Sequence, residues 1–246
     1  MAFDFDLATT TVEGLCLGNV TRVRQALCSR LRGVPDEAAV GTFLTNHDMD
    51  RVATELRATD PAALRLAAAA LLTLPGTPWL YYGEEIGMKN GRGQGDIRIR
   101  TPMRWDATAN AGFSSAEPWS GPIDDDGLAP VSAQTQDPES LLTLYRELIA
   151  LRKGHPALRL GSARPLEASS GGKRPLALHR AREGEEVVVV YNFSRSPEQV
   201  RIEDAVLAGK SFKDLRTGEA GRSAGADGVL DLGEVEAYGF RVLSAR

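Results

Sequence analysis

The chain has 246 residues, of which 42% are hydrophobic and 25% charged, and its 29 basic and 33 acidic side chains give a net charge of −4. This length and composition are ordinary for one or two globular domains with a normal core. The two signs are interspersed and form no basic stripe, so neither nucleic acid nor an anionic membrane surface is expected as a partner.

Neither membrane insertion nor export is predicted. The longest apolar run, from about Leu66 to Leu74, is too short to span a bilayer and ends at a Pro-Gly pair. The amino terminus has no basic region followed by a long apolar segment, which favours a cytoplasmic location. Cys16 and Cys28 match no zinc spacing and are expected to be buried free thiols. No metal ion and no cofactor are predicted.

The first two thirds of the chain alternate short β-prone runs with helical patterns, an order typical of βα units around a parallel sheet. Residues 62–74 predict a helix that is apolar nearly all round, which must be covered on more than one side. Asp60 and Pro61 supply its N-cap and first-turn proline. The expected strands are residues 2–5, 40–44 and 79–82, and the expected helices are residues 20–31, 62–74 and 137–153, the last opening at Asp137 and Pro138.

From about residue 160 the apolar pattern changes to a period of two. Short β-prone runs are separated by Gly, Ser and charged turns, which is typical of an antiparallel sandwich. The expected strands are residues 175–182, 186–193, 198–202, 210–215, 228–232 and 235–243. We therefore predict an α/β part at residues 1–159 and an all-β sandwich domain at residues 160–246.

The most informative stretch is residues 42–48, an apolar lead-in that stops on Asn46, His47 and Asp48. An α/β barrel places its working groups at the carboxyl ends of its strands, and few structural reasons would put these three residues there. The structural alternative is that His47 and Asp48 form an N-cap pair that opens the next helix.

Two further stretches downstream carry similar information. Residues 74–88 read LPGTPWLYYGEEIGM and residues 98–106 read RIRTPMRWD. Together with TFLTNHD at residues 42–48, they resemble, in the right order, motifs of the alpha-amylase family, glycoside hydrolase family 13. The resemblance is strong over residues 40–106 and extends by architecture over nearly the whole chain. It implies that residues 1–159 are units six to eight of a (β/α)8 TIM barrel and that residues 160–246 are the family's C-terminal β-domain.

The resemblance also implies a chemistry. Enzymes of this family are retaining glycosidases, which need a carboxylate nucleophile and a carboxylic acid about 5–5.5 Å apart. In the family these groups precede the stretch matched by residues 42–48, and nothing before Asp48 resembles them; Asp4 and Asp6 match the sixth strand instead. Asp48 would accept hydrogen bonds from the sugar hydroxyls in the transition state, and His47 would donate to the same hydroxyls.

Two arginines are candidate substrate-binding residues, each with a structural alternative. Arg51 could reach a sugar hydroxyl or hold a carboxylate, or it could be a solvated charge at a helix start. Arg100 lies in the loop where the family places substrate-lining residues, or it forms a salt bridge to Asp96 or Asp106. Glu84 and Glu85 are adjacent, so their side chains should diverge, and a structural role is expected.

Two hypotheses about function follow. In the first, the chain is the C-terminal part of a retaining glycoside hydrolase acting on α-glucosidic bonds of oligosaccharides or α-glucans, active when the front half of the barrel is supplied and inactive alone. In the second, it is a noncatalytic sugar-binding or interaction module. Three strands taken from a closed barrel leave two unpaired edges, so binding to the missing barrel half or self-association is expected.

Overall fold

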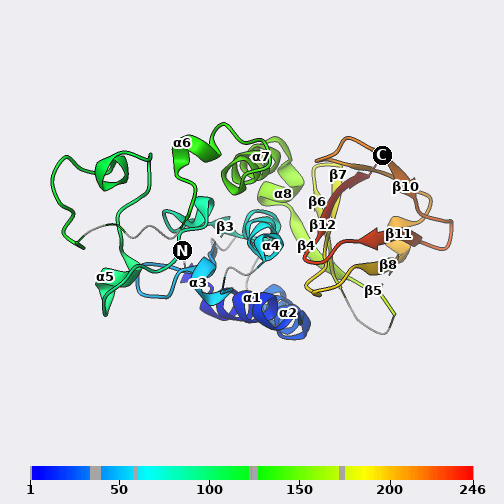
Figure 1. The fold of residues 1–246 in the computed structure, drawn as a ribbon. Helices are drawn as coiled ribbons and strands as arrows, with labels where there is room; N and C mark the ends of the chain where they lie inside the picture. Colours follow the sequence, from blue (N-terminus) through cyan, green and yellow to red (C-terminus); the bar gives the residue numbers. More distant parts are fainter. Residues whose placement is uncertain are drawn as a thin grey trace.

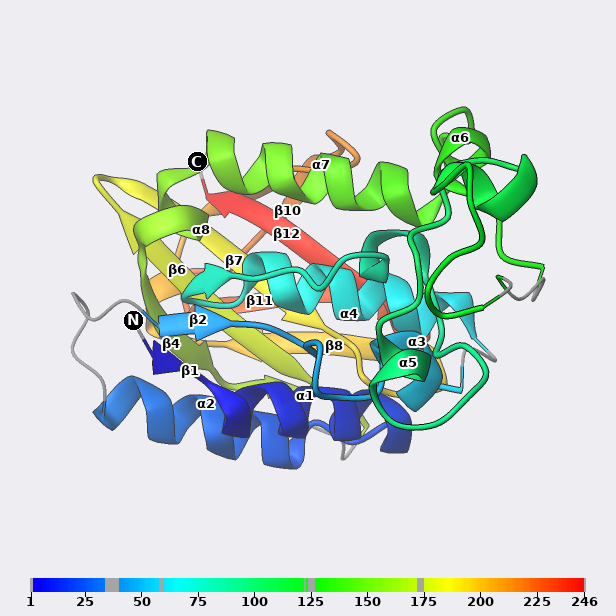
Figure 2. The same cartoon turned by 90° about the vertical axis from the view of Figure 1, so that its left-hand side faces the viewer.

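The computed structural model describes residues 2–33, 40–57, 60–121, 123, 127–171 and 175–245. Within these ranges the chain forms layers (Figure 1). A small parallel sheet lies on one side of a group of helices, and two antiparallel sheets lie on the other side. Seen from the left-hand side of Figure 1, the parallel strands lie in front of helix α4, and α1, α2 and α7 flank it (Figure 2).

The parallel sheet has the order β1-β2-β3, so β1 and β3 are its edges. Gly41 in the central strand sits where a Cβ atom would come within 2.8 Å of Phe3 and 3.2 Å of Trp79, so a side chain there would push these rings away. The elements of this part are β1 Ala2–Phe3, α1 Phe5–Leu17, α2 Thr21–Gly33, β2 Val40–Thr42, α3 Val52–Glu55, α4 Pro61–Thr73 and β3 Thr77–Pro78.

The expected strand at residues 79–82 is wrong. Strand β3 ends at Pro78 because its neighbour β2 ends at Thr42, and the amide of Trp79 makes the last bond between them, to the Thr42 carbonyl at 2.8 Å. The strand expected at residues 2–5 is also shorter, because Asp4 begins a helix that the sequence analysis missed. Its carboxylate accepts from the Leu7 amide at 3.0 Å and caps α1.

A long segment with only short helices follows β3, and the chain then returns to the helical layer at α7. The helix expected from Asp137 begins later, at Leu141, because Ser140 is the N-cap and accepts from the Thr143 amide at 3.1 Å. Residues 137–140 instead form a turn in which the Ser140 amide donates to the Asp137 carbonyl. The elements are η1 Glu84–Ile86, α5 Asp96–Ile99, η2 Ala109–Gly112, α6 Val131–Gln134, α7 Leu141–Gly154 and α8 Pro156–Leu160.

The remaining residues form two antiparallel sheets, of orders β10-β9-β12-β7-β6-β4 and β11-β8-β5. Apolar residues from both sheets, such as Val188, Val200 and Leu230, belong to one buried cluster, so the sheets face each other. The elements are β4 Ser162–Leu166, β5 Ala168–Ser169, β6 Leu176–Arg182, β7 Glu185–Tyr191, β8 Glu198–Glu203, η3 Ala205–Leu207, β9 Ser211–Asp214, β10 Ala220–Ser223, β11 Val229–Val235 and β12 Phe240–Ala245.

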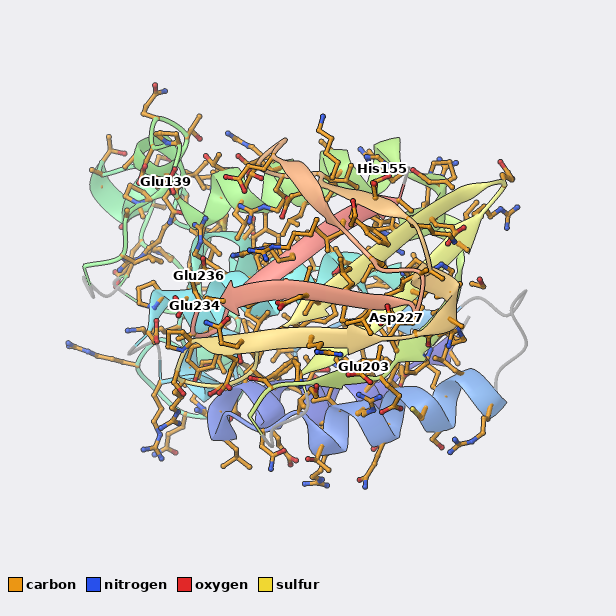
Figure 3. The ribbon with its side chains drawn as sticks, turned by 90° about the vertical axis from the view of Figure 1, so that its right-hand side faces the viewer. Glu139, His155, Glu203, Asp227, Glu234 and Glu236 are labelled. Carbon is orange, nitrogen blue, oxygen red and sulfur yellow. The ribbon has the colours of Figure 1, made fainter. Side chains whose placement is uncertain are left out.

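Three of these strands, β4, β5 and β10, were not expected, and the strand expected at residues 235–243 is interrupted. A turn separates β11 from β12, in which the Gly239 amide donates to the Glu236 carbonyl and Tyr238 adopts a left-handed φ of 51°. The outer face of the smaller sheet is polar, and Glu203 and Glu234 project from it (Figure 3). Glu203 pairs there with Arg201 at 2.9 Å.

Helix α4 is the centre of the main hydrophobic core. Leu66, Leu71 and Leu72 are at most 1% exposed, and the same cluster contains Val189 of β7 and Val242 of β12. The six-stranded sheet therefore covers the side of α4 that faces away from the parallel sheet. The expected apolar helix is thus covered within the chain, and residues 1–159 and 160–246 share one core.

The carboxyl end of α4 is bound by two buried arginines. Arg180 of β6 donates to the carbonyls of Thr73, Leu158, Gly161 and Ser162 at 2.8–3.1 Å. Arg152 of α7 donates to the carbonyls of Leu72 at 2.9 Å and Leu74 at 3.2 Å, and also to that of Gly76. Burial lowers the pKa of both guanidinium groups to about 10, so both are charged at neutral pH.

None of the helices in the described ranges is long and apolar enough to cross a membrane. Cys16 and Cys28 are free thiols, but both are half-buried rather than buried as expected. The Cys16 Sγ lies on α1 and donates to the Glu55 carbonyl at 3.3 Å.

We predict that Arg180→Met destabilises the protein by about 3–5 kcal/mol, because it removes a donor from four carbonyls, of which those of Thr73 and Leu158 are buried. Urea denaturation followed by circular dichroism measures the change. Arg201→Met is the matched control: its salt bridge is exposed, so its removal should cost no more than about 1 kcal/mol. Equal effects of the two substitutions would contradict the assigned role of Arg180.

Candidate active site

His47 and Asp48 lie in a tight turn beyond the carboxyl end of β2. The Met49 amide donates to the Asn46 carbonyl at 3.2 Å, which places His47 and Asp48 at the two central positions. The Asn46 side chain also accepts from the Asp48 amide at 2.9 Å. The side chains of His47 and Asp48 remain 64% and 66% exposed, so the turn presents both to solvent.

The structural alternative for this pair is wrong. The N-cap of the next helix, α3, is Arg51, and neither His47 nor Asp48 caps it. Instead the His47 Nε2 atom lies 3.4 Å from Asp48 Oδ2. The turn therefore brings an imidazole and a carboxylate together without using either to begin a helix.

Arg100 comes to this turn from a distant part of the chain. Its Nη2 atom is 2.7 Å from Asp48 Oδ1, and its Nε atom donates to the His47 carbonyl at 2.9 Å. Its Nη1 atom is 2.8 Å from Asp96 Oδ2, so the expected salt bridge to Asp96 is also present. The structure thus places Arg100, His47 and Asp48 in one cluster.

Two tyrosines hold the segment that carries Arg100. The Tyr81 hydroxyl donates to the Ile99 carbonyl at 2.9 Å, and the Tyr82 hydroxyl donates to the Thr101 carbonyl at 2.7 Å. These bonds lie on either side of Arg100 in the sequence. The sequence pattern predicts no role for Asn46, Tyr81 or Tyr82, although an Asn at the start of a turn is a recognisable signal.

Arg51 lies underneath this surface, in a place that neither sequence interpretation anticipated. It is 1% exposed, so it is not a solvated charge at a helix start. Its guanidinium carbon lies 4.6 Å from the ring centres of both Tyr81 and Tyr82, and its Nη1 atom donates to the Tyr82 carbonyl at 2.6 Å. These contacts support the two tyrosines, and substrate binding by Arg51 stays a prediction.

Glu84 and Glu85 diverge as expected. Glu84 is 3% exposed, and its Oε1 atom accepts from the Tyr145 hydroxyl of α7 at 2.7 Å. Burial, the largest cause, and the charge on Glu85 together raise the pKa of Glu84 to about 8, although the Tyr145 hydrogen bond and the charge on Arg51 both act to lower it. Glu84 is therefore largely protonated at neutral pH, which fits a structural role.

Comparison with known proteins assigns the family. Residues 3–161 match the model of the alpha-amylase catalytic domain. This chain belongs to the alpha-amylase family. It is 33% identical over 213 residues to the trehalose synthase/amylase TreS of Mycobacterium tuberculosis, a match that covers 69% of this chain and 35% of that protein. It is 31% identical over 171 residues to the alpha-amylase SusG of Bacteroides thetaiotaomicron, covering 67% and 24%.

The fold is that of the alpha-amylases. The crystal structure of the H. orenii alpha-amylase superposes on the whole of this chain with a TM-score of 0.79 and 28% identity, and this chain covers 49% of that one. The family member described here thus spans about half of that structure and about a third of TreS. Within the described part of this family member, no group of three or more His, Cys, Asp or Glu could hold a metal ion.

We predict that stability falls as pH rises from about 4.5 to about 8, the usual and the folded pKa of Glu84. A carboxyl whose pKa is raised by folding favours the native state while it is protonated, and that contribution is lost on ionisation. The steepest slope is about 1.4 kcal/mol per pH unit. Glu84→Gln keeps an acceptor for Tyr145 and should flatten the slope, as measured by urea denaturation at several pH values. An unchanged slope would mean that Glu84 is ionised in the folded protein.

Proposed function

We propose that this chain supplies the transition-state-stabilising part of a retaining glycoside hydrolase that acts on α-glucosidic bonds of oligosaccharides or α-glucans. Asp48 is the residue on which the proposal depends. The observation that carries it is the cluster of Asp48, His47 and Arg100 at the carboxyl end of the parallel sheet, where an α/β barrel places its chemistry.

The geometry of the cluster suits a hydroxyl-bearing substrate. Asp48 directs one carboxylate oxygen to Arg100 at 2.7 Å and the other towards His47 at 3.4 Å, and the side chain is largely exposed. Sugar hydroxyls could therefore donate to the carboxylate while Arg100 keeps it in place. Such hydrogen bonds lower the barrier when they strengthen as positive charge develops on the ring.

We further propose that β1, β2 and β3 are strands six to eight of the barrel. The nucleophile and the general acid would come from residues outside this chain, on the strands that complete the barrel. Chemistry would then need the two parts together, with the two carboxylates on opposite sides of the scissile bond.

The surface that would meet the rest of the barrel is apolar. Phe3, Phe5, Trp79 and Leu80 are 38–55% exposed, and Phe3 contacts Trp79 edge to face with ring centres 5.1 Å apart. These side chains lie on or beside the edge strands β1 and β3. Because α4 is already covered within the chain, this aromatic surface is the part of the α/β region best suited to binding the missing barrel strands or a second copy.

The alternative, a noncatalytic sugar-binding or interaction module, draws on a different observation. The core shared by α4, α7 and the six-stranded sheet gives this chain an extensive folded centre of its own. A unit with its own core can persist without the rest of a barrel, and the exposed Asp48 cluster would then bind sugar without cleaving it.

We predict that the isolated chain does not hydrolyse p-nitrophenyl α-glucoside, maltose or starch. Fusion to the part of the H. orenii alpha-amylase that this chain does not cover should restore turnover. In the active fusion, Asp48→Asn should lower kcat about 30- to 1000-fold, the cost of about 2–4 kcal/mol of transition-state stabilisation.

The control for this experiment is Asp227→Asn in the turn before β11 (Figure 3), which should keep turnover within about twofold of the parent. Equal turnover of the Asp48→Asn fusion and its parent would remove Asp48 from the mechanism. Robust turnover by the isolated chain would show that the nucleophile and the acid lie within these residues.

We also predict that Trp79→Asp weakens association. The partner is either the H. orenii alpha-amylase part, now added as a separate chain, or a second copy of this chain. Removing a large aromatic anchor from an interface commonly costs about tenfold or more in affinity. Sedimentation velocity at several concentrations measures the loss. Leu160→Asp changes another exposed apolar side chain, 58% exposed on α8, and should leave association unchanged. The opposite result would place the interface near α8.

A further inference from the structure

Arg51 is a buried cation that forms no salt bridge within the described ranges. Its Nη1 atom donates to the Tyr82 carbonyl, but its Nε and Nη2 atoms are buried and have no hydrogen-bond partner among the described residues. Its guanidinium carbon lies 4.6 Å from the ring centres of both Tyr81 and Tyr82. The face of an aromatic ring attracts a cation and can accept from an N–H group, so the two rings take the place of the missing acceptors. Rotation of either ring away from Arg51 would leave a buried charge uncompensated.

The orientation of the two rings decides where their hydroxyl groups lie. The rings of Tyr81 and Tyr82 meet edge to face, with centres 4.8 Å apart and an angle of 69° between their planes. Tyr81 donates to the carbonyl before Arg100, that of Ile99, at 2.9 Å. Tyr82 donates to the carbonyl after it, that of Thr101, at 2.7 Å. Burial raises the pKa of the Tyr81 hydroxyl, so this group still donates at neutral pH.

The tyrosine hydroxyls fix a segment that has little support of its own. Helix α5, which ends just before Arg100, has only four residues, and an isolated helical turn is not stable in water. From this place Arg100 reaches Asp48 at 2.7 Å and the His47 carbonyl at 2.9 Å. A shift of the end of α5 would therefore move the guanidinium group that holds the Asp48 carboxylate.

Arg51 connects the tyrosine pair to the segment that carries Asp48. It follows Asp48 closely in the chain and is the N-cap residue of α3. Its amide donates to the Asn90 side chain at 2.9 Å, which fixes its backbone. The same residue is thus bound to the backbone beyond β2 through its amide and to the tyrosines beyond β3 through its guanidinium group.

We infer that Arg51 is a positioning residue for the proposed reaction. Through the two tyrosine rings it holds Arg100 in place, and Arg100 in turn directs the carboxylate of Asp48. In this role Arg51 acts without touching the substrate. A displacement of about 1 Å at a reacting group can lower a rate about 100-fold, so such a support bears directly on turnover. The inference rests on the proposed function for the role of Asp48 and adds the buried residues on which that role depends.

The first test uses the isolated full chain and needs no enzymatic activity. The Arg100 Nε–H group donates to the His47 carbonyl, so its exchange with solvent, followed by NMR, should be slow in the parent. Arg100→Lys identifies its resonance. Tyr82→Phe keeps the ring over Arg51 and removes only the hydroxyl, and it should speed this exchange about three- to tenfold. Arg51→Met should speed it at least as much, and Arg51→Lys, which keeps a cation beside the rings, should restore part of the protection.

The matched control is Tyr238→Phe. The Tyr238 hydroxyl also donates to a backbone carbonyl, that of Leu15 at 3.2 Å, but Tyr238 lies in the turn between β11 and β12. This variant should leave the exchange of the Arg100 Nε–H group unchanged. Circular dichroism and urea denaturation of each variant separate a local effect from a loss of folding.

The second test uses the active fusion with the H. orenii part. Tyr82→Phe should lower kcat about three- to tenfold and change KM by less than about twofold, because the contacts of Asp48 strengthen in the transition state. In a fusion that already carries Asp48→Asn, Tyr82→Phe should lower kcat by less than about twofold, because the carboxylate that it helps to position is absent. A merely structural role would give the same factor in both backgrounds.

Two outcomes would overturn the inference. They are an Arg100 exchange rate that Tyr82→Phe and Arg51→Met leave unchanged, and equal losses of kcat with and without the Asp48 carboxylate. Failure of the proposed function is distinguishable from both. An inactive fusion would remove the catalytic role of Asp48, and the exchange measurement on the isolated chain would still decide whether Arg51 and the tyrosines position Arg100.

Discussion

The fold depends on the hydrogen bonds that the last carbonyls of helix α4 receive, because the carboxyl half of this helix is buried. Helix α4 lies between a parallel and an antiparallel sheet, where water cannot reach its last carbonyls. Arg152 and Arg180 supply the donors from α7 and β6, and within the described ranges neither arginine is paired with a carboxylate. Two buried cations are costly, so their contribution comes from the many carbonyls that they bind together. This junction joins the α/β part to the antiparallel sheets.

The same junction positions the candidate active site through the backbone. Arg152 binds the Gly76 carbonyl, one residue before β3, and β3 leads directly to Tyr81 and Tyr82. The tyrosines surround Arg51 and bind the carbonyls on either side of Arg100. A continuous series of contacts therefore links the core to the Asp48 cluster. The exposed Asp48 side chain is therefore held by contacts that reach the core. Such positioning suits the proposed role of Asp48, in which one geometry of the sugar ring is favoured.

The charges of the protein divide into two kinds. Around Asp48 they are exposed and paired, including Arg98 with Asp50 at 2.7 Å. Exposed pairs contribute little stability, so this network is better suited to orienting groups than to holding the fold. In the core, the buried charge of Arg180 is bound by neutral carbonyls, whereas Glu84 is bound by a tyrosine and is largely uncharged because its pKa is raised. The smaller antiparallel sheet, whose outer face is polar, lies on the far side of the helices from the parallel sheet (Figure 1).

The sequence predicted the features that local patterns encode: the order of α/β then antiparallel elements, the apolar helix α4, the divergence of Glu84 and Glu85, and the family. It misjudged strand 79–82 and did not predict the burial of Arg51, because the length of a strand depends on its neighbour and the exposure of an arginine depends on what packs over it. It did not identify Asn46, Tyr81 and Tyr82 as supports. Local sequence thus determined which residues follow β2, whereas only the tertiary structure decided that Arg100, from a segment over 50 residues away, completes the site with Asp48.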